Sequence, residues 1–75
     1  MNKMNFAERI NKCFTSKVTL DVHYDHITSL IHFDTNIPIS RIKEFDVVLF
    51  KELMNERGVK FQPATFNNNL RITIT

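Results

Sequence analysis

The sequence has one cysteine, one glycine, two prolines and no tryptophan among its 75 residues. Because Cys13 is the only cysteine, the chain cannot form an internal disulfide or a zinc site built from several cysteines. A glycine-rich phosphate loop is excluded as well, since Gly58 stands alone. A single thiol is typical of a reducing compartment, so we expect a cytoplasmic location.

Long apolar runs and runs of like charge are also missing. Lysine and arginine total 10 residues, aspartate and glutamate total 8, and both signs are scattered along the chain. This distribution argues against a basic nucleic-acid tail and against an acidic mimic of DNA. No segment approaches the roughly 18 consecutive apolar residues of a membrane helix, and the N-terminus lacks the apolar core of a signal peptide. We therefore expect a soluble protein without a membrane partner.

Alternation of apolar and polar residues is the strongest pattern present. It runs through residues 70–75 and twice through residues 17–34, which is typical of strands with one face in a core. In the first hairpin, a two-residue turn at Asp25-His26 is predicted to set Leu20 opposite Ile31. In the second, Asn67-Asn68 is predicted to form the turn, because asparagine tolerates positive φ.

A segment whose apolar residues have helical spacing precedes each hairpin. Asn5-Phe6-Ala7-Glu8 has the form of a capping box and begins an apolar stripe that predicts a helix over residues 6–14. A second helix is predicted over residues 40–57, and Gly58 supplies the left-handed residue that ends it. Asp46 is anomalous, because it falls within the apolar seam of this helix, where an unpaired carboxylate is costly. We expect it at the wetter end of the seam, favoured by the helix N-terminus or paired with a basic residue. Contact with a lysine or arginine of a partner is the alternative.

These elements predict one α+β domain over residues 1–75, with the order αββαββ. We expect a four-stranded, mostly antiparallel sheet with both helices on one face and the strand order 3-4-2-1. This order resembles a ferredoxin-like domain whose first strand has moved to the end of the chain. The fourth strand is expected inside the sheet, parallel to the second strand and antiparallel to the third.

The first hairpin carries the one cluster that resembles a chemical site. Its members are His23, His26, His32, Asp21, Asp25 and Asp34. On the predicted outer face, Asp21, His23 and His32 could converge on a divalent metal. A solvated strand face is the alternative that we favour, since the spacing is not diagnostic of a ligand set. Cys13 falls in the apolar stripe of the first helix and is expected to be an inert core thiol. We assign no catalytic residue, metal or cofactor.

Surplus apolar surface is the feature that favours a function. The second predicted helix is more apolar than one contact with a small sheet requires, and exposed apolar patches usually mark interfaces. We interpret Val47, Phe50 and Met54, together with Leu30 of the outer sheet face, as a protein-binding surface. The alternative is that the first helix covers the three residues of the second. The sequence thus predicts a small non-catalytic module that binds a cellular protein, in the manner of phage-encoded inhibitors and regulators.

A homodimer is also expected, because a 75-residue domain without a disulfide is marginally stable alone. Two-fold symmetry would bring the same patch of both copies together. Either helix contacts through Phe50 and Met54 or edge pairing of the first strand, between Lys17 and Tyr24, could form it.

The alternative function is nucleic-acid binding through a weakly basic surface. A four-stranded sheet backed by two helices resembles RNA-binding domains, which stack bases on exposed aromatic side chains. No phenylalanine or tyrosine is expected on the outer face here. Phosphate contacts would therefore depend on Arg9, Lys12, Lys60 and Arg71.

Overall fold

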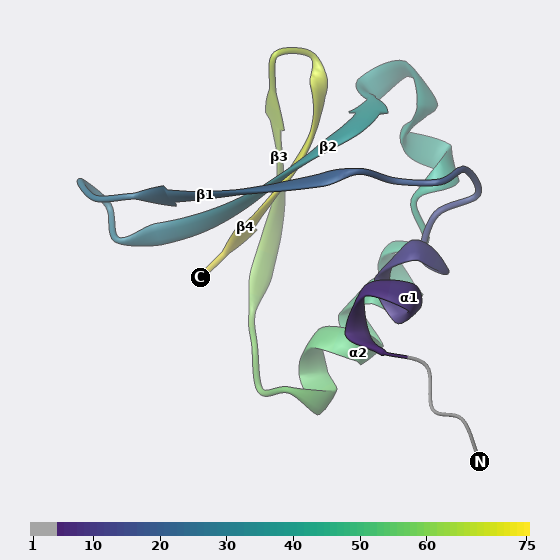
Figure 1. Ribbon diagram of the computed structural model, residues 1–75, viewed down its shortest axis with the longest axis horizontal. Coiled ribbons are helices and arrows are strands. Elements are labelled where there is room, and N and C mark those ends of the chain that lie inside the picture. The colour runs from purple at the N-terminus through teal and green to yellow at the C-terminus, as the bar shows by residue number, and fades with distance from the viewer. Residues whose placement is uncertain (1–4) are drawn as a thin grey trace.

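Two hairpins share one antiparallel sheet in the computed structural model, which describes residues 5–75 (Figure 1). The first hairpin consists of β1 (Leu20–Asp25) and β2 (Leu30–Pro38), and the second of β3 (Phe61–Phe66) and β4 (Asn69–Ile74). The strand order is β1-β2-β4-β3, so β4 lies inside the sheet. The predicted α+β class, element order and strand order are confirmed.

The direction of β4 differs from the prediction. It is antiparallel to β2 as well as to β3, with Phe33 of β2 opposite Ile72 of β4. β2 and β3 therefore run parallel to each other on either side of β4. The chain between them makes the helical crossover that a parallel arrangement requires. This is the split β-α-β unit of ferredoxin-like domains, with β4 as the inserted strand.

The second hairpin has the predicted register. Asn67 and Asn68 have φ angles of 53° and 64°, as a tight two-residue turn with both central residues left-handed requires. Phe61 lies opposite Ile74, and Pro63 lies opposite Ile72. Pro63 is on an edge strand, where its missing N–H leaves no central ladder position unpaired.

The first hairpin has a longer turn than predicted. Leu20 lies opposite Thr35 and not opposite Ile31, a shift of four residues, and residues 26–29 form the loop. The loop is held by Asp25, whose Oδ1 accepts a hydrogen bond from the Ile27 N–H at 2.9 Å. An even shift leaves every side chain on its predicted face, because the side-chain period of a strand is two.

The predicted second helix is divided into two elements. A 3₁₀ helix, η1 (Ile39–Glu44), is followed by extended backbone at Phe45 and then by α2 (Val47–Glu56). Asp46 is exposed and is the N-cap of α2, where its carboxylate accepts a hydrogen bond from the Leu49 N–H at 3.0 Å. The predicted seam is therefore interrupted before Asp46, and the expected place of this carboxylate at a helix N-terminus is confirmed.

Phe45 leaves the helix because it pairs with Phe14. α1 (Phe6–Asn11) ends before Phe14, and the two phenylalanines form an isolated antiparallel bridge. Within it, the Asp46 N–H donates to the Cys13 carbonyl at 2.6 Å. The two rings stack with their centroids 4.9 Å apart, and both side chains are buried. A helix continued through Phe45 would lose this contact.

α2 ends as predicted. Gly58 has φ +66°, its N–H donates to the Asn55 carbonyl, and the Val59 N–H donates to the Met54 carbonyl. These two bonds define a Schellman motif, which satisfies carbonyls at the helix end. None of the helices formed by residues 5–75 is long and apolar enough to cross a membrane.

The pairing of β2 with β4 is irregular beside the core. The register between β2 and β4 shifts beside Thr35, whose buried hydroxyl donates to the Leu70 carbonyl at 2.9 Å and accepts from the Ile37 N–H at 3.1 Å. The helices and one end of the sheet enclose the core. Its buried members are Ile10, Cys13, Phe14, Val18, Ile37, Phe45, Phe50, Leu53, Met54, Leu70 and Ile72.

Replacement of Asp46 tests the corrected start of α2. We expect Asp46→Ala to lower the free energy of unfolding by about 1 kcal/mol, because it removes the N-cap acceptor. Asp46→Asn is the matched control and is expected to lose less, since its amide oxygen can still accept the bond. Urea denaturation measures both. An increase in stability on Asp46→Ala, as expected for relief of a buried carboxylate, would contradict the cap.

Candidate functional site

The four residues predicted to bind a protein do not form one surface. Phe50 and Met54 are only 2% and 3% exposed and belong to the core, which corrects the prediction for both. Val47 is exposed on the first turn of α2. Leu30 lies at the loop end of β2, on the outer sheet face away from the helices. The buried residues of α2 face the sheet, whereas Val47, Val48 and Leu49 in its first turn are 44%, 66% and 39% exposed.

Further exposed apolar side chains lie on the inner face of the first hairpin. Val22 and Tyr24 of β1 are 68% and 48% exposed, and Ile31 of β2 is 39% exposed. They lie on the same sheet face as the core residue Ile72. The hairpin extends to the left in Figure 1, whereas α1 and α2 lie at the other end of the sheet. Within residues 5–75, the helices leave this end uncovered.

A groove connects this exposed face with the core. It has a cavity volume of about 230 Å³ and apolar walls contributed by both helices and by three strands. Its lining includes Phe6, Ile10, Leu20, Ile31, Phe33, Met54 and Ile74. Arg57 at the rim places its guanidinium 4.0 Å from the centroid of the Phe6 ring.

The size and chemistry of the groove limit what it can hold. Pockets for drug-sized molecules measure roughly 300–1,000 Å³ and contain several polar groups that orient the ligand. This groove is smaller, and its walls are apolar. One or two apolar side chains of a partner would fill it, and the exposed Val22 and Tyr24 would continue the contact along the hairpin.

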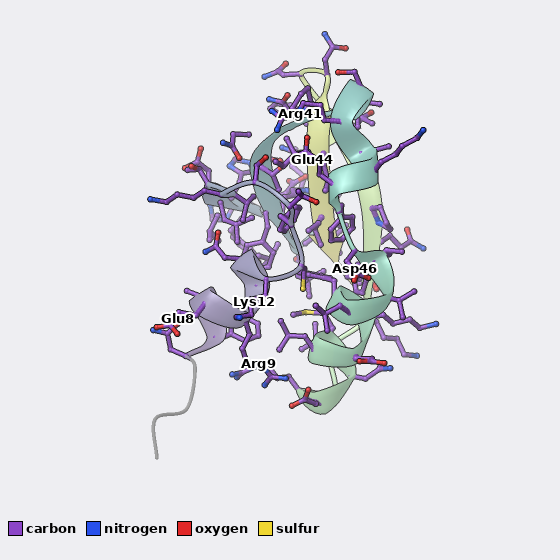
Figure 2. The ribbon with its side chains drawn as sticks, turned by 90° about the vertical axis from the view of Figure 1, so that its right-hand side faces the viewer. Glu8, Arg9, Lys12, Arg41, Glu44 and Asp46 are labelled. Atoms are coloured by element: carbon purple, nitrogen blue, oxygen red, sulfur yellow. The ribbon has the colours of Figure 1, made fainter. Side chains whose placement is uncertain are left out.

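The four cationic residues of the alternative function are dispersed. Arg9 on α1 forms an ion pair with Glu56 of α2, and Lys12 is the C-cap of α1 (Figure 2). Lys60 precedes β3, and Arg71 lies on the outer face of β4 in an ion pair of its own. Two of the four charges are thus matched by carboxylates within the chain.

The outer sheet face carries an aromatic ring that sequence reasoning missed. Phe66 is 46% exposed, and the Arg71 guanidinium lies 3.9 Å from its ring centroid. Arg71 also donates to both carboxylate oxygens of Asp34, one of them at 2.9 Å. These hydrogen bonds hold the pKa of Asp34 below its usual range. Arg71 therefore already occupies one face of the Phe66 ring.

The histidines of the first hairpin contact neighbouring strand residues. His23 lies opposite His32, with the ring centroids 6.2 Å apart, and His32 Nδ1 is 2.9 Å from the Thr73 hydroxyl. Asp21 lies opposite Asp34. Among residues 5–75, no three histidine, cysteine, aspartate or glutamate side chains form a group that could hold a metal ion.

Cys13 belongs to the core and not to a reactive site. It is 1% exposed, and burial raises the pKa of its thiol. A raised pKa keeps the sulfur protonated at neutral pH, which disfavours nucleophilic chemistry.

The lengths of the helices explain where the groove lies, whereas the longer helices predicted over residues 6–14 and 40–57 do not reveal it. Helices rise 1.5 Å per residue and strands about 3.3 Å. α1 and α2 have 6 and 10 residues, whereas β2 alone has 9. The helices are therefore too short to cover the inner face of the whole hairpin.

Comparisons of this chain with protein-family models, with curated proteins and with solved structures find no match.

Acid titration tests the pair formed by Arg71 and Asp34. Because the folded-state pKa of Asp34 is lowered, the stability it contributes is fully present above about pH 4, the usual aspartate pKa, and is lost as the pH falls through the folded-state value. We expect Asp34→Asn to lower the free energy of unfolding at neutral pH by about 1 kcal/mol. The variant should also lose less stability than the wild type on further acidification.

Glu56→Gln is the control for this titration, because it removes the more exposed ion pair with Arg9. Urea denaturation at a series of pH values measures all three proteins. Equal effects of Asp34→Asn and Glu56→Gln would contradict a special role of the outer-face pair.

Proposed function

We propose that this chain is a small non-catalytic module that binds an apolar segment of a partner protein in the groove beside the first hairpin. The continuity of the exposed inner hairpin face with an apolar groove supports this proposal. Contiguous apolar surface of this kind usually marks an interaction site. A cytoplasmic regulator or inhibitor of the phage-encoded type is the biological role that we infer for it.

A protein segment fits this surface better than a nucleic acid. Phosphate binding depends on clustered cations, and both Arg9 and Arg71 already contact carboxylates. An apolar groove instead accepts Leu-, Ile- or Phe-like anchors, whose burial contributes about 1.5–3 kcal/mol each. The partner that we infer therefore presents one or two such side chains from an exposed segment.

Selection of peptides against the immobilised protein tests this function. We expect enrichment of sequences with apolar anchors, and we expect their binding to perturb amide NMR signals around Ile31, Phe33 and Ile74. Ile31→Gln should weaken the selected peptides about tenfold, because it removes an apolar wall of the groove. Fluorescence anisotropy measures the affinities.

Leu49→Gln is the matched control, because Leu49 and Ile31 are both 39% exposed but Leu49 lies on α2 outside the groove. Thermal unfolding verifies that both variants fold. Equal loss of peptide binding in the two variants would contradict the groove. Oligonucleotide binding that falls steeply with salt, in the absence of any peptide binding, would favour the nucleic-acid alternative.

A further inference from the structure

β1 is an edge strand without the proline or β-bulge that protects many sheet edges. Within residues 5–75 it pairs with β2 alone, so the backbone groups on its other side have no strand partner. The opposite edge strand, β3, contains Pro63, which cannot donate to an added strand. β1 contains no proline, keeps an unbroken register over Leu20–Asp25 and presents only uncharged residues on its inner face.

β1 is also complementary to itself. When two copies are paired antiparallel about Val22, Leu20 of each copy lies opposite Tyr24 of the other on the inner face. On the outer face, Asp21 of each copy lies opposite His23 of the other. The pairing matches apolar residues with apolar residues and a carboxylate with an imidazole, both of which favour cross-strand contact.

Two neighbouring registers keep the same side chains on the inner face, but both are less favourable. Pairing about Asp21 brings the two Asp21 carboxylates together. Pairing about His23 sets Asp21 opposite Asp25 twice. Like charges directly opposite each other destabilise a strand pair. The register centred on Val22 pairs residues 20–24 of both copies and avoids both conflicts.

We propose that two copies of this chain associate through antiparallel pairing of their β1 strands about Val22. The pairing buries the free edge of Val22 and Tyr24, which are 68% and 48% exposed in the single copy, and leaves the inner sheet face above them open. It brings Tyr24 of the second copy beside Leu20, which lines the apolar groove, and so extends the groove wall. Dimerisation requires only two copies of this chain. Experiments can therefore confirm or contradict the dimer independently of peptide binding.

Site-directed disulfide formation tests the register. On the two-fold axis the two Val22 Cα atoms would lie about 4.5–5.5 Å apart, within the range that a disulfide can span. Val22→Cys should therefore form a covalent dimer under mild oxidation. Val48→Cys is the matched control, because Val48 is an exposed valine, 66% accessible, on α2. The native Cys13 is 1% exposed and does not compete.

The expected rate of cross-linking for Val22→Cys exceeds that for Val48→Cys about tenfold or more, because paired strands hold the two thiols at high effective concentration. A mixture of Asp21→Cys with His23→Cys should also cross-link, whereas Asp21→Cys alone should not. Equal rates for Val22→Cys and Val48→Cys would overturn the proposal.

Sedimentation of the unmodified protein tests the association itself. We expect a monomer–dimer equilibrium at submillimolar concentration. His23→Asp should weaken it about tenfold, because it sets two pairs of carboxylates against each other. Adding Asp21→Lys to His23→Asp should restore dimerisation, since each carboxylate then faces an ammonium group.

Circular dichroism verifies that the single and double variants keep the fold. A species of 8.9 kDa at every concentration would overturn the dimer. A dimer that His23→Asp does not weaken would overturn the pairing about Val22. Peptide binding by Ile31→Gln bears on the groove alone, so the two proposals remain separable.

Discussion

The contact between Phe14 and Phe45 determines where both helices lie. It keeps Phe45 in extended backbone, so that α2 begins at Val47 with its apolar side toward the sheet. The ring of Phe50 then lies 5.4 Å from that of Phe45 and 4.8 Å from that of Phe61. This row of aromatic rings joins the segment after α1, the start of α2 and the edge strand β3. Both short helices are thereby held over one end of the sheet, and the other end stays open.

Alternation in the sequence predicted the faces of the sheet but not the length of every turn. In the second hairpin, two adjacent asparagines favour positive φ, and this local preference fixes the register. In the first hairpin, the Asp25 side chain accepts a hydrogen bond within a longer loop. The dipeptide Asp25-His26 does not indicate whether the turn has two residues or four. The shift was even, so Val22 and Tyr24 stayed on the predicted inner face although their partners changed.

The break before α2 and the binding surface depend on contacts that no local pattern contains. Residues 40–57 are compatible with a continuous helix, and Phe45 is drawn out of it by Phe14 from a distant part of the chain. With this break, Phe50 and Met54 lie in the core, so the apolar surface left on the second helix is limited to its first turn. The groove and the exposed hairpin face exist because the helices are shorter than the first hairpin. These relative lengths are known only from the folded structure.

The place of β4 in the chain has a consequence for synthesis. β4 is made after the other three strands, yet it lies between β2 and β3 and joins the two hairpins. Until β4 has left the ribosome, Phe33 lacks its neighbour Ile72, and the inner face of the first hairpin is more exposed than in the finished protein. Nascent chains therefore pass through a stage with uncovered apolar strands, in which chaperones or other nascent copies can bind them.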